Sequence, residues 1–276
     1  MAKTVRVAAF AALAIVATPF GYRALAQVPI DTTKFAQAVP VAGDIPGLYK
    51  WENSRVSDSA TVKLTAPTEG QHLRVGDSVF VTVSVSGVAI GAQTQFAEFC
   101  GLANSGQGQH THVIVDNEPY VANYATGQPF NIGVLSPGVH TVRVFASRSW
   151  HESIKSPGSF KSVTFFVGDS SMESPILRGD PLLTYSRPKG TYTGDEARAI
   201  MVDFYLRNVV LSPDGYKVRL TVDGKSTLLT DWVPYLVTGL TPGDHVFKLE
   251  LLHKDGKLVA GKYNSTERKI VIKEKL

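Results

Sequence analysis

The chain contains an internal duplication, and this feature limits its possible folds most strongly. The segment His112–Asp116 can be laid over Arg219–Asp223, and Leu135–His140 over Leu240–His245. From the aspartate to the histidine the two copies count 24 and 22 residues. A repeat of this kind predicts two similar folds in tandem and argues against one closed barrel.

Short segments with alternating apolar and polar residues, separated by Gly, Pro, Asn and Asp, fill both copies, and this pattern is typical of β-strands. Only 19% of the residues are charged, which disfavours a long-helix or coiled-coil protein. We therefore predict an all-β chain of two tandem Ig-like or fibronectin-III-like β-sandwich domains, residues 61–168 and 176–276, joined by a linker at 169–175. The predicted strands are Val62–Ala66, Ser78–Ser86, Gln95–Cys100, Thr111–Val115, Pro129–Leu135, His140–Ser147 and Phe160–Val167, then Leu182–Ser186, Ala199–Arg207, Lys217–Val222, Lys225–Leu229, Tyr235–Leu240, His245–Leu252 and Glu267–Lys273.

The N-terminus has the pattern of a secretory signal peptide over residues 1–26. Lys3 and Arg6 precede an apolar run, Val7–Phe20, and the sequence Ala24-Leu25-Ala26 supplies a small-residue cleavage site. An uncleaved N-terminal anchor is the alternative. Residues 27–60, rich in Pro and Gly, read as a lead-in or linker segment. No later segment is long and apolar enough to cross a membrane, so we expect a periplasmic or secreted protein without a transmembrane segment after signal cleavage.

Charge and cysteine content narrow the possible partners. The formal net charge is +4, with 28 Lys and Arg against 24 Asp and Glu. Three of the basic residues lie in the signal peptide, so the mature chain has a net charge of only +1. This balance does not predict a nucleic-acid partner. The single cysteine, Cys100, excludes an intrachain disulfide, so stability must come from packed cores.

The strongest candidate for chemistry is the pair His110 and His112. Residues two apart on a strand point to the same face, which places the two imidazoles side by side where they can share a metal ion, copper or zinc. The second copy has Lys217 and Arg219 there, so the fold itself does not require the pair. The alternative is a solvated strand face without a metal. Candidates for a third ligand are Cys100, Glu98, Asp116 and the dipeptide His151-Glu152.

A loop after the strand that ends at Ser147 carries Arg148, Trp150, His151 and Glu152. A tryptophan beside polar groups on a loop can stack on a sugar or a peptide side chain, so these four residues are candidate ligand-binding residues for an unknown protein, peptide or glycan. Trp150 folded back over the sandwich end is the alternative. His140 and His245 occupy matching positions in the two copies, which predicts a shared structural hydrogen bond.

The strand His110–Asp116, the turn Leu135–His140 and the stretch Ser147–Ser153 resemble parts of bacterial exported proteins of uncharacterised function built from tandem Ig-like sandwiches. The resemblance implies a bacterial envelope or extracellular protein and supplies no reaction. No catalytic motif assembles, so we expect a non-catalytic binding or structural protein without a cofactor. The alternative is an envelope metal-binding protein that uses His110 and His112.

Overall fold

The computed structural model describes residues 38–51, 59–95, 97, 100–169, 174, 176 and 179–274. The predicted signal peptide, Glu98 and most of the predicted linker lie outside these residues. Within them the chain is all-β, with 3₁₀ conformation confined to short segments such as Gly194–Ala197, which confirms the predicted fold class. No helix in the described part is long and apolar enough to cross a membrane.

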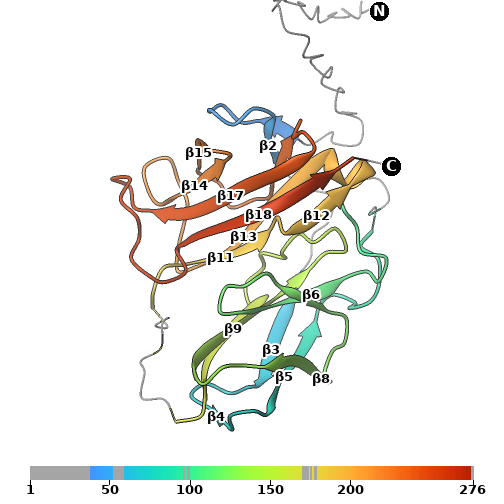
Figure 1. Ribbon diagram of the computed structural model, residues 1–276, viewed down its shortest axis with the longest axis vertical. Helices are drawn as coiled ribbons and strands as arrows, with labels where there is room; N and C mark the ends of the chain where they lie inside the picture. The colour runs from blue at the N-terminus through green and yellow to red at the C-terminus, as the bar shows by residue number, and fades with distance from the viewer. Residues whose placement is uncertain are drawn as a thin grey trace, which may run out of the picture.

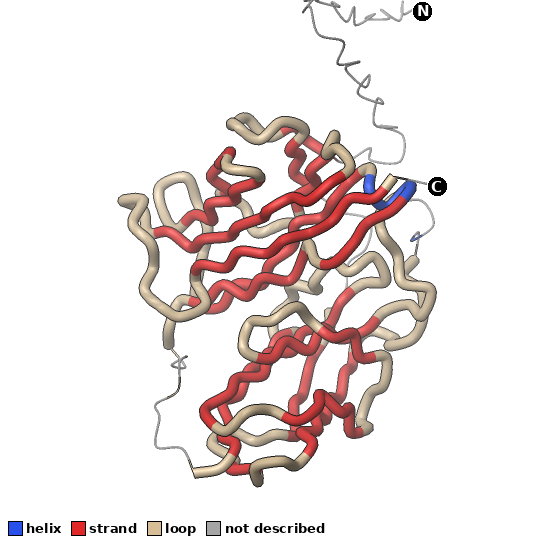
Figure 2. The backbone as a smooth tube through the Cα atoms, viewed as in Figure 1, coloured by secondary structure: helices blue, strands red, loops and turns tan. Residues whose placement is uncertain are grey.

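The first sandwich packs a three-stranded sheet on a five-stranded sheet (Figures 1 and 2). The smaller sheet has the order β3 (Thr61–Ala66), β5 (Ser78–Ser86), β8 (Pro129–Val134). The larger has the order β4 (His72–Leu73), β10 (Phe160–Val167), β9 (Gly138–Ser147), β6 (His110–Val115), β7 (Val121–Asn123). Alternate residues of each strand enter the core, which is built largely of valines: Val62, Val79, Val81, Val83, Val113, Val142 and Val144.

The second sandwich repeats this plan. One sheet has the order β12 (Gly190–Thr193), β18 (Ser265–Lys273), β17 (Gly243–Leu252), β14 (Lys217–Val222), β15 (Lys225–Leu229). It matches the five-stranded sheet of the first sandwich strand by strand, including a parallel strand at the edge, β4 in one and β12 in the other. The facing sheet contains β16 (Tyr235–Thr238), β13 (Ala199–Arg207) and β11 (Leu182–Arg187). The predicted duplication is therefore present in the structure as well as in the sequence.

The repeated histidines have the same hydrogen bonds in both sandwiches. His140 places Nδ1 at 2.6 Å from Asp116 Oδ2 and Nε2 at 2.7 Å from the Ser136 carbonyl oxygen. His245 places Nδ1 at 2.6 Å from Asp223 Oδ2 and Nε2 at 2.7 Å from the Thr241 carbonyl oxygen. Each ring ties the turn before its strand to the end of a neighbouring strand, so the predicted structural role is confirmed.

Two local predictions need correction. Part of the predicted lead-in segment forms β1 (Ala38–Pro40) and β2 (Leu48–Trp51), and β2 pairs with β16, so these strands extend a sheet of the second sandwich. Figure 1 shows β2, in blue, beside the orange strands. Leu48 is buried in the second core, which accounts for this docking. The predicted strand at Gln95–Cys100 is wrong, because none of its described residues is in a strand: Gln95 lies in a turn, Ala97 is 3₁₀-helical and Cys100 lies in a bend. Ala97 and Cys100 pack into a small cluster between the sandwiches.

Candidate functional site

The two histidines of β6 lie on the face of the strand that points away from the core of the first sandwich. Val113, between His112 and Ile114, belongs to that core, whereas Ile114 packs with Tyr205 of the second sandwich. His110 and His112 share the face of Ile114 and are fully buried. Their Nε2 atoms are 3.1 Å apart, which confirms that the imidazoles lie side by side. The solvated-face alternative is wrong, because the second sandwich covers this face.

His151 supplies the third ring. Its Nδ1 lies 3.1 Å from His110 Nε2, and the candidate ligand atoms of His110, His112 and His151 all lie within 4.8 Å of one another. A bridge between Ser147 and Ser153 closes the loop that carries His151. His151 is partly exposed and therefore forms the outer edge of the three-histidine group.

The backbone at His151 is in the left-handed region, with φ of 71°. The equivalent residue of the second copy is Gly256, with φ of 82°, since both residues donate a backbone hydrogen bond of 2.9 Å to the third residue before them. A residue with a Cβ atom is disfavoured in this conformation, and such residues concentrate at functional sites. The first copy therefore has a histidine where the second copy has a glycine, and this difference is the sequence signal that favours His151 as the third residue of the histidine group.

Hydrogen bonds on the far side of the rings orient them. His110 Nδ1 lies 2.9 Å from the Gly108 carbonyl oxygen, which can only accept, so Nδ1 carries the proton and Nε2 keeps its lone pair. His112 Nδ1 lies 3.0 Å from the hydroxyl of Ser186 in β11 of the second sandwich. Partners of this kind set the tautomer and direction of metal-binding imidazoles. The site thus takes a positioning group from each sandwich.

The environment keeps the three rings neutral. The pKa of His110 is lowered to about 4, chiefly by burial; the hydrogen bond with Gly108 opposes this shift, and the positive charges of Arg187 and Lys189 add to it. Burial is also the main cause that holds the pKa of His112 and of His151 well below the usual value, and the neighbouring histidines, Arg187 and Lys189 act in the same direction. All three rings are therefore neutral at neutral pH, and neutral imidazole is the form that binds a metal ion.

One aromatic and two basic residues near the rings were not indicated as members of this site by the sequence patterns. The Tyr120 ring stacks on His112, with ring centres 3.5 Å apart and planes 5° apart, and its hydroxyl lies 3.1 Å from His151 Nδ1. Lys189 Nζ lies 4.0 Å from the centre of the Tyr120 ring. Arg187 Cζ lies 5.5 Å from the same centre. Both basic residues follow β11 or end it, so they come from the second sandwich.

The other predicted metal ligands that the structure describes lie elsewhere. Cys100 does not join the three-histidine group; it packs in the cluster with Trp51 and Trp150, and its thiol donates to the Ala97 carbonyl oxygen at 2.9 Å. The Asp116 carboxylate bonds His140 and the backbone of Thr141. Glu98 lies outside the described residues. Cys100 as a ligand is therefore a wrong prediction, because its buried, apolar surroundings turn the thiol away from the histidines.

The predicted ligand-binding loop is not an exposed platform. Trp150 is 2% exposed, its ring meets the edge of Trp51, and its indole N–H donates to Glu152 Oε2 at 2.8 Å. Arg148 is also buried and pairs with Glu152. Of the four predicted residues only His151 is partly exposed. Trp150 thus folds back into the structure and offers no surface for stacking.

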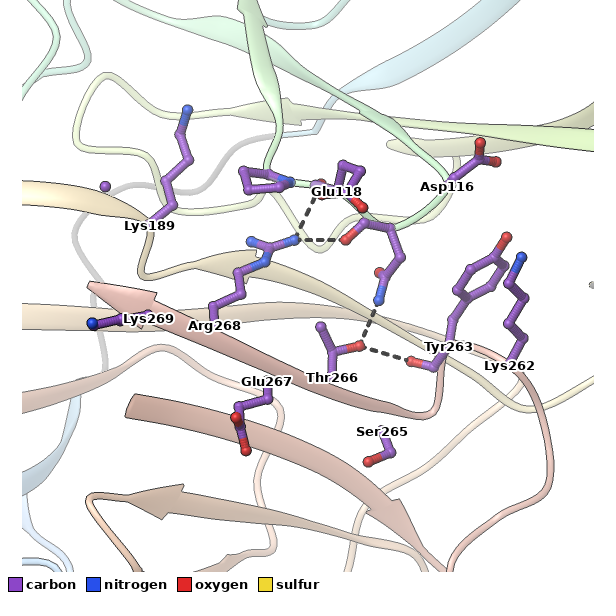
Figure 3. Close-up of a pocket in the computed structure, with 13 residues that line it drawn as sticks. Asp116, Glu118, Lys189, Lys262, Tyr263, Ser265, Thr266, Glu267, Arg268 and Lys269 are labelled. Atoms are coloured by element: carbon purple, nitrogen blue, oxygen red, sulfur yellow. Dashed lines mark hydrogen bonds between the residues drawn. The ribbon is translucent and has the colours of Figure 1, made fainter. Parts of the chain in front are cut away.

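A cleft of about 440 Å³ opens beside this site, between the turn at 116–119 of the first sandwich and β18 of the second. Figure 3 shows Arg268 reaching from β18 to that turn, where it donates to the carbonyl oxygens of Asn117 and Glu118 at 3.1 and 3.2 Å. Lys189 lines the cleft and also donates to the Tyr120 carbonyl oxygen at 2.8 Å. The cleft therefore shares Lys189 with the surroundings of the three-histidine group.

No protein-family model and no curated protein matches the chain. Solved structures with tandem β-sandwiches do. The fibronectin(III)-like modules of Clostridium thermocellum CbhA match at 14% identity and a TM-score of 0.26, over 78% of this chain and 95% of theirs. The two tandem V-type regions of VCBP3, a v-region-containing chitin binding protein, match at 12% identity and a TM-score of 0.24, over 79% of this chain and 100% of theirs. The tandem Ig repeats of Dlar match at 7% identity and a TM-score of 0.23, over 79% of this chain and 100% of theirs. Likenesses this low carry no argument about activity.

Proposed function

We propose that the chain is a non-catalytic metal-binding protein that holds one copper or zinc ion between its two sandwiches. The ligands are Nε2 of His110, Nε2 of His112 and Nδ1 of His151. The convergence of these three nitrogens carries the proposal. Around a tetrahedral ion with metal–nitrogen bonds of about 2.0–2.1 Å, ligand atoms lie roughly 3.3 Å apart. Two of the nitrogen pairs already lie at 3.1 Å, close to that separation.

The donor set selects the class of metal. Three neutral imidazoles suit zinc and copper, whereas magnesium and calcium require oxygen ligands. The hydrogen bonds that the two Nδ1 atoms form, with the Gly108 carbonyl oxygen as acceptor and with the Ser186 hydroxyl, support the same role, because they leave both Nε2 atoms directed at the common centre. A hydrogen-bonded cluster without a metal would satisfy the same rings, and the experiment below separates the two.

Zinc titration of the purified, metal-free chain tests the proposal, with stoichiometry from calorimetry and elemental analysis. We expect one ion per chain, and a strong loss of affinity in His110→Ala, His112→Ala and His151→Ala. His253→Ala is the matched control, because His253 is exposed in the equivalent loop of the second copy. Circular dichroism checks that each variant folds. An absence of stoichiometric metal, or a His151→Ala variant that binds as well as the control, would overturn the proposal.

We also propose that the protein is exported to the periplasm or beyond the cell. The support is the sequence pattern of residues 1–26, with its basic start, apolar centre and Ala24-Leu25-Ala26 site. Fractionation of the native host followed by N-terminal sequencing tests this. We expect a mature chain that begins at Gln27 outside the cytosol, and an intact N-terminus in the cytosol would contradict it.

A further inference from the structure

The three-histidine group leaves one coordination position of a tetrahedral metal without a ligand of the usual kind. Among the described residues no further His, Cys, Asp or Glu joins the group. Because all three ligands are neutral, a bound divalent ion would keep its full charge. Buried charges in proteins are paired, so this ion needs a negative partner.

The protein surrounds the site with positive charge instead. Arg187 and Lys189 are the charged groups from the second sandwich that act on all three rings. Lys189 lies against the Tyr120 ring that stacks on His112. Two cations beside a cationic metal would repel it, whereas an anion placed among them would be attracted by all three.

Arg187 also carries an unused donor. The side chain is 8% exposed, and one terminal nitrogen donates to the Tyr192 hydroxyl at 3.0 Å. Its Nε is buried and has no hydrogen-bond partner among the described residues. A buried N–H without an acceptor costs about 1–3 kcal/mol, so an acceptor at this nitrogen would be stabilising. An anion at the metal would supply an acceptor there.

Tyr120 does not fill the open position as it stands. A metal bound to Nε2 lies in the plane of the His112 ring. The Tyr120 ring is parallel to that plane and its centre is 3.5 Å from the centre of the His112 ring. The phenol oxygen is therefore about one stacking distance away from the metal, beyond the bond length of about 2.0–2.2 Å that oxygen ligands need. From that place the hydroxyl can donate to a ligand on the metal.

We propose that the fourth ligand of the metal is a small exogenous anion, a carboxylate or an inorganic oxyanion, held between the metal, the Tyr120 hydroxyl and the Arg187 side chain. This inference rests on the proposed metal site. Lys189 attracts the anion from the cleft, whose wall it forms (Figure 3). No bond in the anion is broken; it binds in exchange for water.

Azide titration of the copper(II)-loaded chain tests this inference, with visible absorption and electron paramagnetic resonance as readouts. We expect a saturable azide-to-copper charge-transfer band, and displacement of azide by formate or by phosphate identifies the carboxylate or oxyanion class. Arg187→Met should weaken azide binding by at least about tenfold, the effect of one lost charge-assisted hydrogen bond. Lys189→Met should weaken it to a similar extent, because it removes a positive charge beside the site. Lys262→Met, another lysine of the cleft, is the matched control. If Arg187→Met does not fold, Lys189→Met alone decides.

The outcomes separate this inference from the metal site itself. If the chain binds no copper, the proposed function fails. If copper binds but azide leaves the spectra unchanged, or if Lys189→Met binds azide as the control does, the anion site fails and the metal site stands. A change of the azide-free spectrum in Tyr120→Phe would overturn the inference by making the phenol the fourth ligand. Failure of both formate and phosphate to displace azide would overturn the proposed class of anion.

Discussion

Replacing Lys155 with methionine is expected to weaken the contact between the two sandwiches strongly. Lys155 Nζ lies 2.7 Å from Oδ1 of Asp203, a fully buried residue of β13. The remaining donors to that carboxylate are the backbone N–H and the hydroxyl of Ser153, at 3.2 and 3.0 Å. Both are neutral, so the variant would leave a buried negative charge without a counter-ion. Breaking a buried pair in this way costs about 3–5 kcal/mol of unfolding free energy.

Urea unfolding of the metal-free chain, followed by tryptophan fluorescence, measures this cost. Lys161→Met is the control, since Lys161 is exposed on β10. The double variant Lys155→Met/Asp203→Asn should recover most of the loss, because asparagine removes the charge and keeps an acceptor for Ser153. A loss below about 1 kcal/mol, the value of a solvated pair, or a double variant no more stable than the single one, would refute the reasoning.

Three further predictions concern the site and the junction. Ser186→Ala should lower zinc affinity about 10–100-fold in calorimetry, because it removes the group that orients His112, whereas Ser78→Ala, on an exposed position, should not. The metal-free chain should lose stability as the pH falls from about 6.5 towards 4, because His110 takes up a proton in the unfolded chain at a higher pH than in the folded chain. In a pH series of urea unfolding, the unfolding free energy of His110→Ala should depend less steeply on pH. Trp51→Ala should lower the unfolding free energy by about 3–5 kcal/mol in the same assay, because Trp51 packs on Trp150 across the junction. An effect below about 1 kcal/mol would contradict a stabilising role of β2 at the junction.

The sequence predicted the features that depend on neighbours along the chain. Alternation located most of the strands, and the repeated turn before His140 and His245 predicted two copies of one fold with one shared hydrogen bond. Spacing placed His110 and His112 side by side, because the two-residue period of a strand is fixed by the backbone.

The same patterns did not decide which residues contact one another across the fold. Four candidates for a third ligand stood in the sequence, and among those that the structure describes only His151 lies beside His110 and His112, because the loop after β9 turns back over β6. The sequence was compatible both with Trp150 as an exposed binding residue and with Trp150 folded back over the sandwich end, and its burial against Trp51 shows the second. Residues 38–51 lacked a clear period, since two short strands give too few residues to show one.

By itself, the sequence determined an all-β chain, its duplication and the face shared by two histidines, since these follow from local backbone geometry. Only the tertiary structure decided that this face is buried, because the covering residues Tyr205, Ser186 and Arg187 come from the other sandwich. Packing between segments so far apart in the chain leaves no period in the sequence, so the pairing that makes the site is visible only in the folded chain.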